Sequence, residues 1–156
     1  MPFDMSWLVQ NHVILSVGWG DSDLDEFREA NRIITEFIHE GLASGSKSVH
    51  LYVNLSYVRR QANPFEAAGL MTIHHEKGLG YIVNTGRGNS LVVRFANFLA
   101  RATHYPIHFF DEPEHALSFL QMKDPLLPEL LPLYLEKMKT IEKKHFLSPG
   151  KQNSIG

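Results

Sequence analysis

Short segments of alternating or β-branched apolar residues recur along the chain, separated by segments in which apolar residues return every three or four positions. Alternating and β-branched residues are typical of strands, whereas the longer spacing is typical of helices. Five segments have the strand pattern: 6–10, 12–19, 49–53, 79–84 and 106–110. Only Asn11 separates the first two, so we expect them to form a hairpin.

The first helix is predicted directly after this hairpin. Asp23 and Glu26 are three residues apart, which is the spacing of a capping box, and apolar residues then recur at helical intervals. Gly41 follows the last of them. We expect this glycine to form a left-handed cap at the end of the helix.

Two more helices are predicted in the middle of the chain. Asn63, Pro64 and Glu66 supply an N-cap, a first-turn proline and a capping-box acid, and the pattern indicates a helix from there to about Lys77. The apolar residues of the third helix lie at helical spacing between positions 91 and 102.

A fourth helix is predicted after the last strand, because Asp111 and Glu114 repeat the capping-box spacing. The element order is then β-β-α-β-α-β-α-β-α. Such alternation indicates an α/β fold in which helices pack on a mixed β-sheet of about five strands. We expect this α/β domain to span residues 1–121.

Residues 122–147 are predicted to form a helical extension with one apolar stripe. The stripe contains Leu131, Tyr134, Leu135, Met138 and Ile141. Packing of the stripe against the domain or a partner subunit is one interpretation, and it motivates a homodimer. Insertion into a membrane surface is the alternative, although the polar face mixes acids with lysines. We expect residues 148–156 to form a disordered tail.

Composition excludes several classes of function. A formal net charge of −2 gives no overall attraction to nucleic acid or anionic membranes. The chain has no cysteine, which excludes disulfides, thiolate catalysis and thiolate-bound zinc. The first residues lack the features of a secretory signal, and no apolar run has the roughly 20 residues needed to span a bilayer. From these features we expect a cytoplasmic protein.

The segment 49–71, VHLYVNLSYVRRQANPFEAAGLM, resembles the core of the STAS domain, the fold of anti-sigma-factor antagonists. In phosphorylated members of that family the strand ends in Asp-Leu-Ser, and a loop leads to Asp-Ser-Ser-Gly-Leu at a helix start, where one serine accepts phosphate. The matching residues here are 54–56, Asn-Leu-Ser, and 66–70, Glu-Ala-Ala-Gly-Leu. The intervening loop is about four residues longer than in that pattern. The segment 105–120 also resembles the C-terminal end of STAS-like proteins.

This resemblance implies a STAS-like regulatory or interaction module that binds a protein partner, and no catalytic activity. The partner-binding residues it implies are Asn54, Ser56, Glu66, Ala67 and Gly69. Alanines at positions 67 and 68 cannot accept phosphate, so we expect no switching by phosphorylation at the usual serine position. Ser56 is the fallback acceptor.

The glycine-rich loop that precedes the third helix is a candidate anion site, because backbone N–H groups are free at a helix N-terminus. Its residues are Gly86, Arg87, Gly88 and Asn89. The alternative is a tight turn capped by Asn89. A polar stripe along the third helix could meet phosphate or an acidic protein, or could simply be a solvated face. It contains Arg94, Asn97, Arg101 and His104.

No other motif predicts chemistry. Nine histidines are present, but His74 and His75 are adjacent and no His-Glu-x-x-His motif occurs, so we expect no metal site. Neither a nucleophile elbow nor a triad is evident, and we expect no catalytic residue and no cofactor. The alternative function is a carrier of a small apolar ligand or lipid, held in a pocket between the loop around Phe65 and the third helix.

Overall fold

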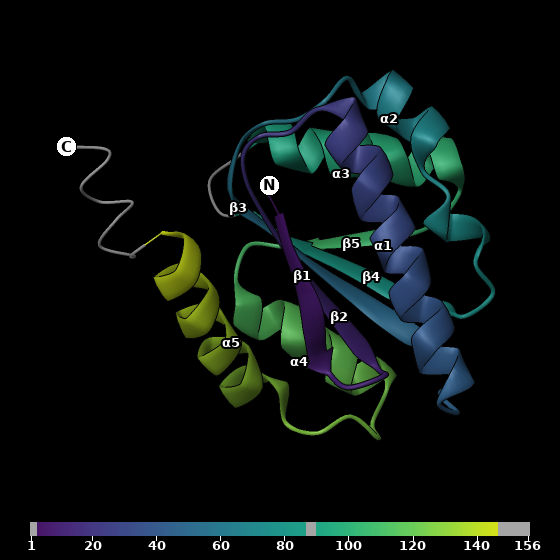
Figure 1. Cartoon of the computed structure of the whole chain (residues 1–156), viewed down its shortest axis with the longest axis vertical. Helices are drawn as coiled ribbons and strands as arrows, with labels where there is room; N and C mark the ends of the chain where they lie inside the picture. The colour runs from purple at the N-terminus through teal and green to yellow at the C-terminus, as the bar shows by residue number, and fades with distance from the viewer. Residues whose placement is uncertain (1–2, 87–89, 147–156) are drawn as a thin grey trace.

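A computed structural model describes residues 3–86 and 90–146, which form one mixed β-sheet covered by helices on both faces (Figure 1). The strands are β1 (Phe3–Val9), β2 (Val13–Asp21), β3 (Val49–Arg60), β4 (Leu79–Thr85) and β5 (Ile107–Phe110). Their spatial order is β1-β2-β3-β4-β5, with β1 antiparallel to β2 and all other pairs parallel. The predicted α/β fold and hairpin are confirmed.

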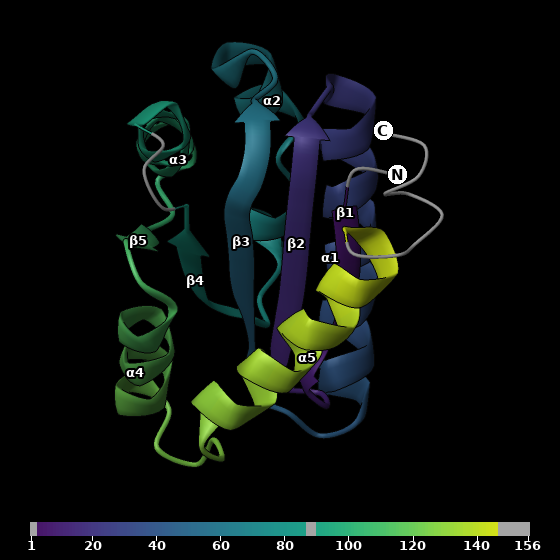
Figure 2. The same ribbon diagram turned by 90° about the vertical axis from the view of Figure 1, so that its left-hand side faces the viewer.

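The helices divide between the two faces of the sheet (Figure 2). They are α1 (Leu24–Ala43), α2 (Pro64–Leu70), α3 (Ser90–Thr103), α4 (Pro113–Lys123) and α5 (Leu130–His145), with a short 3-10 helix at Ile73–His75. Side chains of α1, α2 and α3 share an apolar core with one face, and those of α4 and α5 share a second core with the other. The sheet therefore lies between two apolar cores, one on each face.

The start of α1 is as predicted, but its end is not. Asp23 and Glu26 form the reciprocal capping box. Gly41 lies inside the helix and is buried, and Gly45, with φ +102°, takes the left-handed conformation instead. A Cβ at Gly41 would lie 2.6 Å from Val49 Cγ2 and 2.8 Å from the Asn11 carbonyl oxygen. This glycine permits close approach of the helix to the sheet rather than a turn.

Two boundaries around α2 differ from the predictions. β3 continues to Arg60, because the end of β2, Trp19–Asp21, pairs with it through two register shifts. The longer loop expected after Ser56 is therefore largely strand. α2 ends at Leu70 rather than near Lys77. Beyond it, Thr72 N donates a hydrogen bond to Asn31 Oδ1 of α1 (3.2 Å), which favours a non-helical path of the chain after Leu70.

The start of α4 also differs in detail. The N-cap is Glu112, and no side-chain hydrogen bond caps this end, so the predicted capping box of Asp111 and Glu114 is wrong. Pro113 occupies the first helical position, where its missing N–H costs nothing. The proline therefore sets the start of this helix.

The C-terminal helix α5 packs on the sheet of its own chain. Its buried residues are Leu130, Tyr134, Met138 and Ile141. Leu135, predicted in the same stripe, is exposed. Burial of each large apolar side chain stabilises the fold by about 1.5–3 kcal/mol. Most of the stripe is therefore covered by the sheet of its own chain, as the first interpretation expected, and the homodimer stays a prediction. Among the described residues, no helix combines the length and apolar character needed to cross a bilayer.

Candidate functional site

The carboxyl ends of the parallel strands gather the starts of α1, α2 and α3 at one end of the sheet (Figure 1). Ligands of open α/β sheets bind beyond this end of the strands. At the start of α2, Asn63 Oδ1 accepts hydrogen bonds from Phe65 N (2.9 Å) and Glu66 N (3.4 Å), and Pro64 occupies the first turn. These local interactions fix the helix that carries most of the predicted partner-binding residues.

The structure divides those residues between the surface and the core. Glu66 and Gly69 are exposed on α2, whereas Ala67 is fully buried beneath it. A methyl group has no oxygen to accept phosphate, and Ala67 is in addition sealed from solvent. Of the three predicted partner-binding residues on this helix, Glu66 and Gly69 can therefore meet a partner, and Ala67 cannot.

Asn54 and Ser56 lie on β3, away from α2. Asn54 is 3% exposed, and its Nδ2 donates to the Tyr134 hydroxyl of α5 (3.0 Å). Its Oδ1 accepts from Ser56 N (3.0 Å). Asn54 is thus an internal link to the C-terminal helix and does not reach the surface. Ser56 is exposed.

An aromatic pair joins α2 to α3 on the outside of the molecule. Phe65 is 74% exposed, and its ring packs edge-on against Phe98 with centroids 4.7 Å apart. Leu91, 62% exposed, lies seven residues before Phe98 and hence on the same side of α3, about 10 Å along its axis. We call Phe65, Phe98 and Leu91 the α2–α3 apolar surface.

The α2–α3 apolar surface was not predicted from the sequence, in which Phe65 was expected beside a pocket. The sequence did contain a signal that Phe65 would be exposed. Phe65 and Ala67 are two positions apart, so their side chains point about 200° apart around a helix. Burial of the alanine face therefore turns the phenylalanine outward. Phe65 itself does not line the cavity described below, although Gln61 of the preceding loop and Phe95 and Leu99 of α3 do.

Basic side chains lie on α3, at helical spacing from Leu91 and Phe98, and also at the end of β3. Arg94 and Arg101 are exposed on α3, as are Arg59 and Arg60 at the end of β3. Arg59 Nη2 lies 3.4 Å from Asp21 Oδ1. Of the predicted anion loop, Gly86 is buried, and Arg87, Gly88 and Asn89 lie outside the described residues, so that site stays a prediction.

The histidines show no common metal site: within 3–86 and 90–146, no three His, Asp or Glu side chains are grouped to hold an ion. His74 and His75 lie in the 3-10 helix with ring centroids 3.9 Å apart. Burial, with the neighbouring His75 ring, lowers the pKa of His74. His50 is buried, with Nδ1 accepting from Tyr81 N (3.0 Å) and Nε2 bonded to Asp124 Oδ2 (2.9 Å). Its role is structural.

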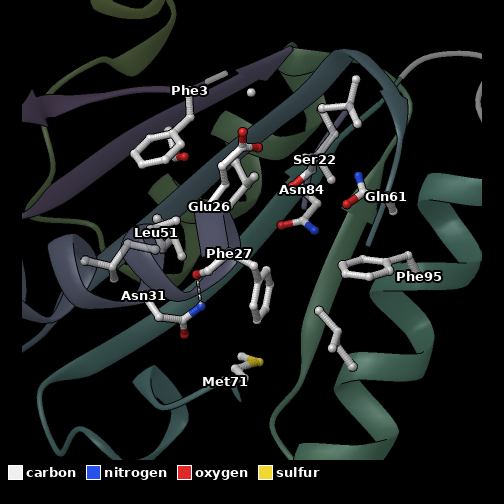
Figure 3. A pocket seen from close by; sticks show the side chains of 18 of the residues that line it. Phe3, Ser22, Glu26, Phe27, Asn31, Leu51, Gln61, Met71, Asn84 and Phe95 are labelled. Carbon is white, nitrogen blue, oxygen red and sulfur yellow. Dashed lines mark hydrogen bonds between the residues drawn. The ribbon is translucent and has the colours of Figure 1, made fainter. Parts of the chain in front are cut away.

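A cavity of about 150 Å³ lies between the sheet and α1 and α3 (Figure 3). Its floor is formed by β2, β3 and β4, and its roof includes Phe27 of α1 and Phe95 of α3. Met71 and Ile73, after α2, close one side. Figure 3 shows the amide of Asn84 directed into the space that Phe27 and Phe95 border. Glu26 and Gln61, both half-buried, also line the cavity.

No family model and no curated protein matches the chain. Among solved structures, the anti-sigma factor antagonist SpoIIAA in its unphosphorylated form is similar, with a TM-score of 0.50 and 12% identity over 78% of this chain and 98% of that one. An uncharacterized DUF3478-family protein with a SpoIIAA-like fold from Shewanella loihica has a TM-score of 0.51 and 12% identity, over 76% and 91% respectively. The chain therefore has the STAS-like, SpoIIAA-like fold that the segment 49–71 indicated.

Proposed function

We propose that the protein is a noncatalytic, STAS-like interaction module that binds a protein partner through the α2–α3 apolar surface and the adjoining Glu66 and Gly69. The observation that carries this proposal is the exposure of Phe65 and Leu91 on neighbouring helices. Single exposed apolar residues are common, whereas several on one side of a helix pair favour an interaction site. The fold shared with an anti-sigma factor antagonist supports a regulatory role.

The residues of the α2–α3 apolar surface indicate what kind of partner would bind there. Phe65 is large, rigid through its contact with Phe98, and protrudes from α2, which are properties of an anchor that fills a pocket. Arg94 is exposed on α3, three residues after Leu91. A partner with an apolar pocket and an acidic rim complements both features.

Regulation would differ from that of relatives switched by a phosphoserine on this helix. The two alanines at positions 67 and 68 remove the acceptor hydroxyls, so binding through α2 is constitutive with respect to phosphorylation there. Any control of binding must act on the partner or elsewhere on this chain.

The proposal is tested by photo-crosslinking inside the cells that make the protein. A photoreactive residue replaces Gly69, whose Cβ position has no atom within 4 Å, and in a second variant it replaces Lys139, exposed on α5 across the sheet. We expect one discrete protein adduct from position 69 and none from position 139. The same adducts from both positions, or none from position 69, would count against the surface.

A further inference from the structure

We propose that the cavity between the sheet and helices α1 and α3 binds a small neutral aromatic alcohol of about the size of phenol, whose hydroxyl donates a hydrogen bond to Asn84 Oδ1. This inference goes beyond the proposed partner binding, because neither Phe65 nor Leu91 lines the cavity.

The floor of the cavity is set by strand register. Ser16 of β2 pairs with Val53 of β3, and Val53 pairs with Asn84 of β4, so the three residues form one row across the sheet. The neighbouring row, two residues earlier, contains Leu51 and Ile82. All five line the cavity. The floor therefore has one row with a polar residue at each end and Val53 between them, beside an apolar row.

Asn84 supplies the observation that points to a ligand. Its side chain is only 7% exposed, and no donor among the described residues reaches its Oδ1. A buried amide oxygen left without a donor costs free energy that a bound hydroxyl would recover. Asn31, the other buried amide of the lining, is already used: its Nδ2 donates to Phe27 O (2.9 Å), and its Oδ1 accepts from Thr72 N.

A single water molecule cannot bridge the two polar residues of the cavity floor. Buried waters usually bond to two to four polar groups. Ser16 lies two strands from Asn84, about 10 Å away at the usual strand spacing, with Val53 between them. One water at Asn84 therefore cannot also bond to Ser16, and the polar residues of the lining besides these two and Asn31 are Ser22, Glu26 and Gln61.

The volume of the cavity and the charge of its lining restrict the class of ligand that can bind. Apolar cavities of about 150 Å³ hold a molecule such as benzene, whereas sites for drug-sized ligands occupy roughly 300–1,000 Å³. Phe27 and Phe95, with centroids 6.3 Å apart, border the space with aromatic surfaces. Glu26, a half-buried acid of the lining, disfavours an anion. These features favour a compact neutral molecule over a fatty acid.

The test compares phenol with toluene, in which a methyl group replaces the hydroxyl. Both are titrated into the full chain, and dissociation constants are taken from NMR shifts of the Met71 and Ile73 methyl groups, which line the cavity. In the natural sequence we expect saturable binding of phenol, with a shift of the Asn84 side-chain amide that toluene does not reproduce. Absence of saturable phenol binding, or equal amide shifts with both probes, would overturn the proposal.

Two substitutions separate recognition by Asn84 from the cavity itself. Asn84→Leu keeps a similar volume but removes the acceptor, and we expect the ratio of phenol to toluene affinity to fall about tenfold or more. Ala30→Leu extends into the cavity from α1 and should abolish binding of both probes, whereas Ala43→Leu, exposed on the same helix, should preserve it. An unchanged ratio in Asn84→Leu, or unchanged binding in Ala30→Leu, would contradict the assigned site.

Discussion

The side-chain amide of Asn54 donates a 3.0 Å hydrogen bond to the hydroxyl of Tyr134, which lies 80 positions later in the chain. Both groups are buried. This bond links β3 to α5. The hydroxyl of Tyr57, also on β3, forms a second link by donating a hydrogen bond to Glu142 Oε1 of α5 (2.8 Å). The C-terminal helix is thus part of the folded structure, held by polar as well as apolar contacts.

Removal of the Tyr134 hydroxyl should destabilise the protein. In Tyr134→Phe, Asn54 Nδ2 retains only a weak contact with Met138 Sδ (3.7 Å). We expect the free energy of unfolding, measured with urea, to fall by about 1–2 kcal/mol. The control is Thr140→Ala, which removes an exposed local bond on the same helix and should cost less than about 0.5 kcal/mol. Equal effects of the two substitutions would refute the role of this bond.

Two glycines in helices should respond oppositely to alanine. At Gly41 a Cβ would meet backbone and side-chain atoms closer than 3 Å, so Gly41→Ala should destabilise the fold by about 1–3 kcal/mol despite its better helix propensity. At Gly69 the space is open, and Gly69→Ala should leave stability unchanged or raise it by up to about 1 kcal/mol. Urea unfolding of both variants checks this; a stabilising Gly41→Ala would contradict the close approach of α1 to the sheet.

Stability should decline at alkaline pH because of buried tyrosines. Burial, with the hydrogen bond to Glu142, raises the pKa of Tyr57 to about 12 from its ordinary value of 10.0. Burial also raises the pKa of Tyr134 and Tyr52. A raised pKa means that the folded state holds the proton more tightly than the unfolded state does. The stabilisation is therefore complete below pH 10 and is lost as the pH rises towards 12.

The measurement for this prediction is the urea midpoint at a series of pH values on both sides of 10. The natural sequence should show a falling midpoint above that pH, and Tyr57→Phe should show a smaller fall across the same range. A midpoint that rises with pH, or a fall that Tyr57→Phe leaves unaltered, would be inconsistent with the shifted ionisation of Tyr57.

The element order could be predicted from the sequence because it depends on local patterns. Apolar spacing located the strands, and Asp23 and Glu26 located the start of α1, since both act within a few residues of chain. The end of α2 could not be found in this way. It depends on Asn31, which binds Thr72 N from 41 positions away.

The candidate sites were harder to predict than the fold. The cavity exists only once register aligns Ser16, Val53 and Asn84, and no single segment encodes that alignment. Asn54 matched a family position, yet its partner Tyr134 lies in the C-terminal helix, so its burial was not evident. The resemblance to the STAS domain indicated the region around α2. Which of its side chains reach the surface depends on tertiary packing.

The most direct test of partner binding is the yield of the adduct crosslinked from position 69 when Phe65 is replaced by serine. The control is Leu126→Ser, because Leu126 is 97% exposed in the connection between α4 and α5. We expect Phe65→Ser to lower the yield about tenfold or more, as for loss of an aromatic anchor, and Leu126→Ser to leave it unchanged. An adduct that persists at full yield in Phe65→Ser would contradict the α2–α3 apolar surface as the binding site.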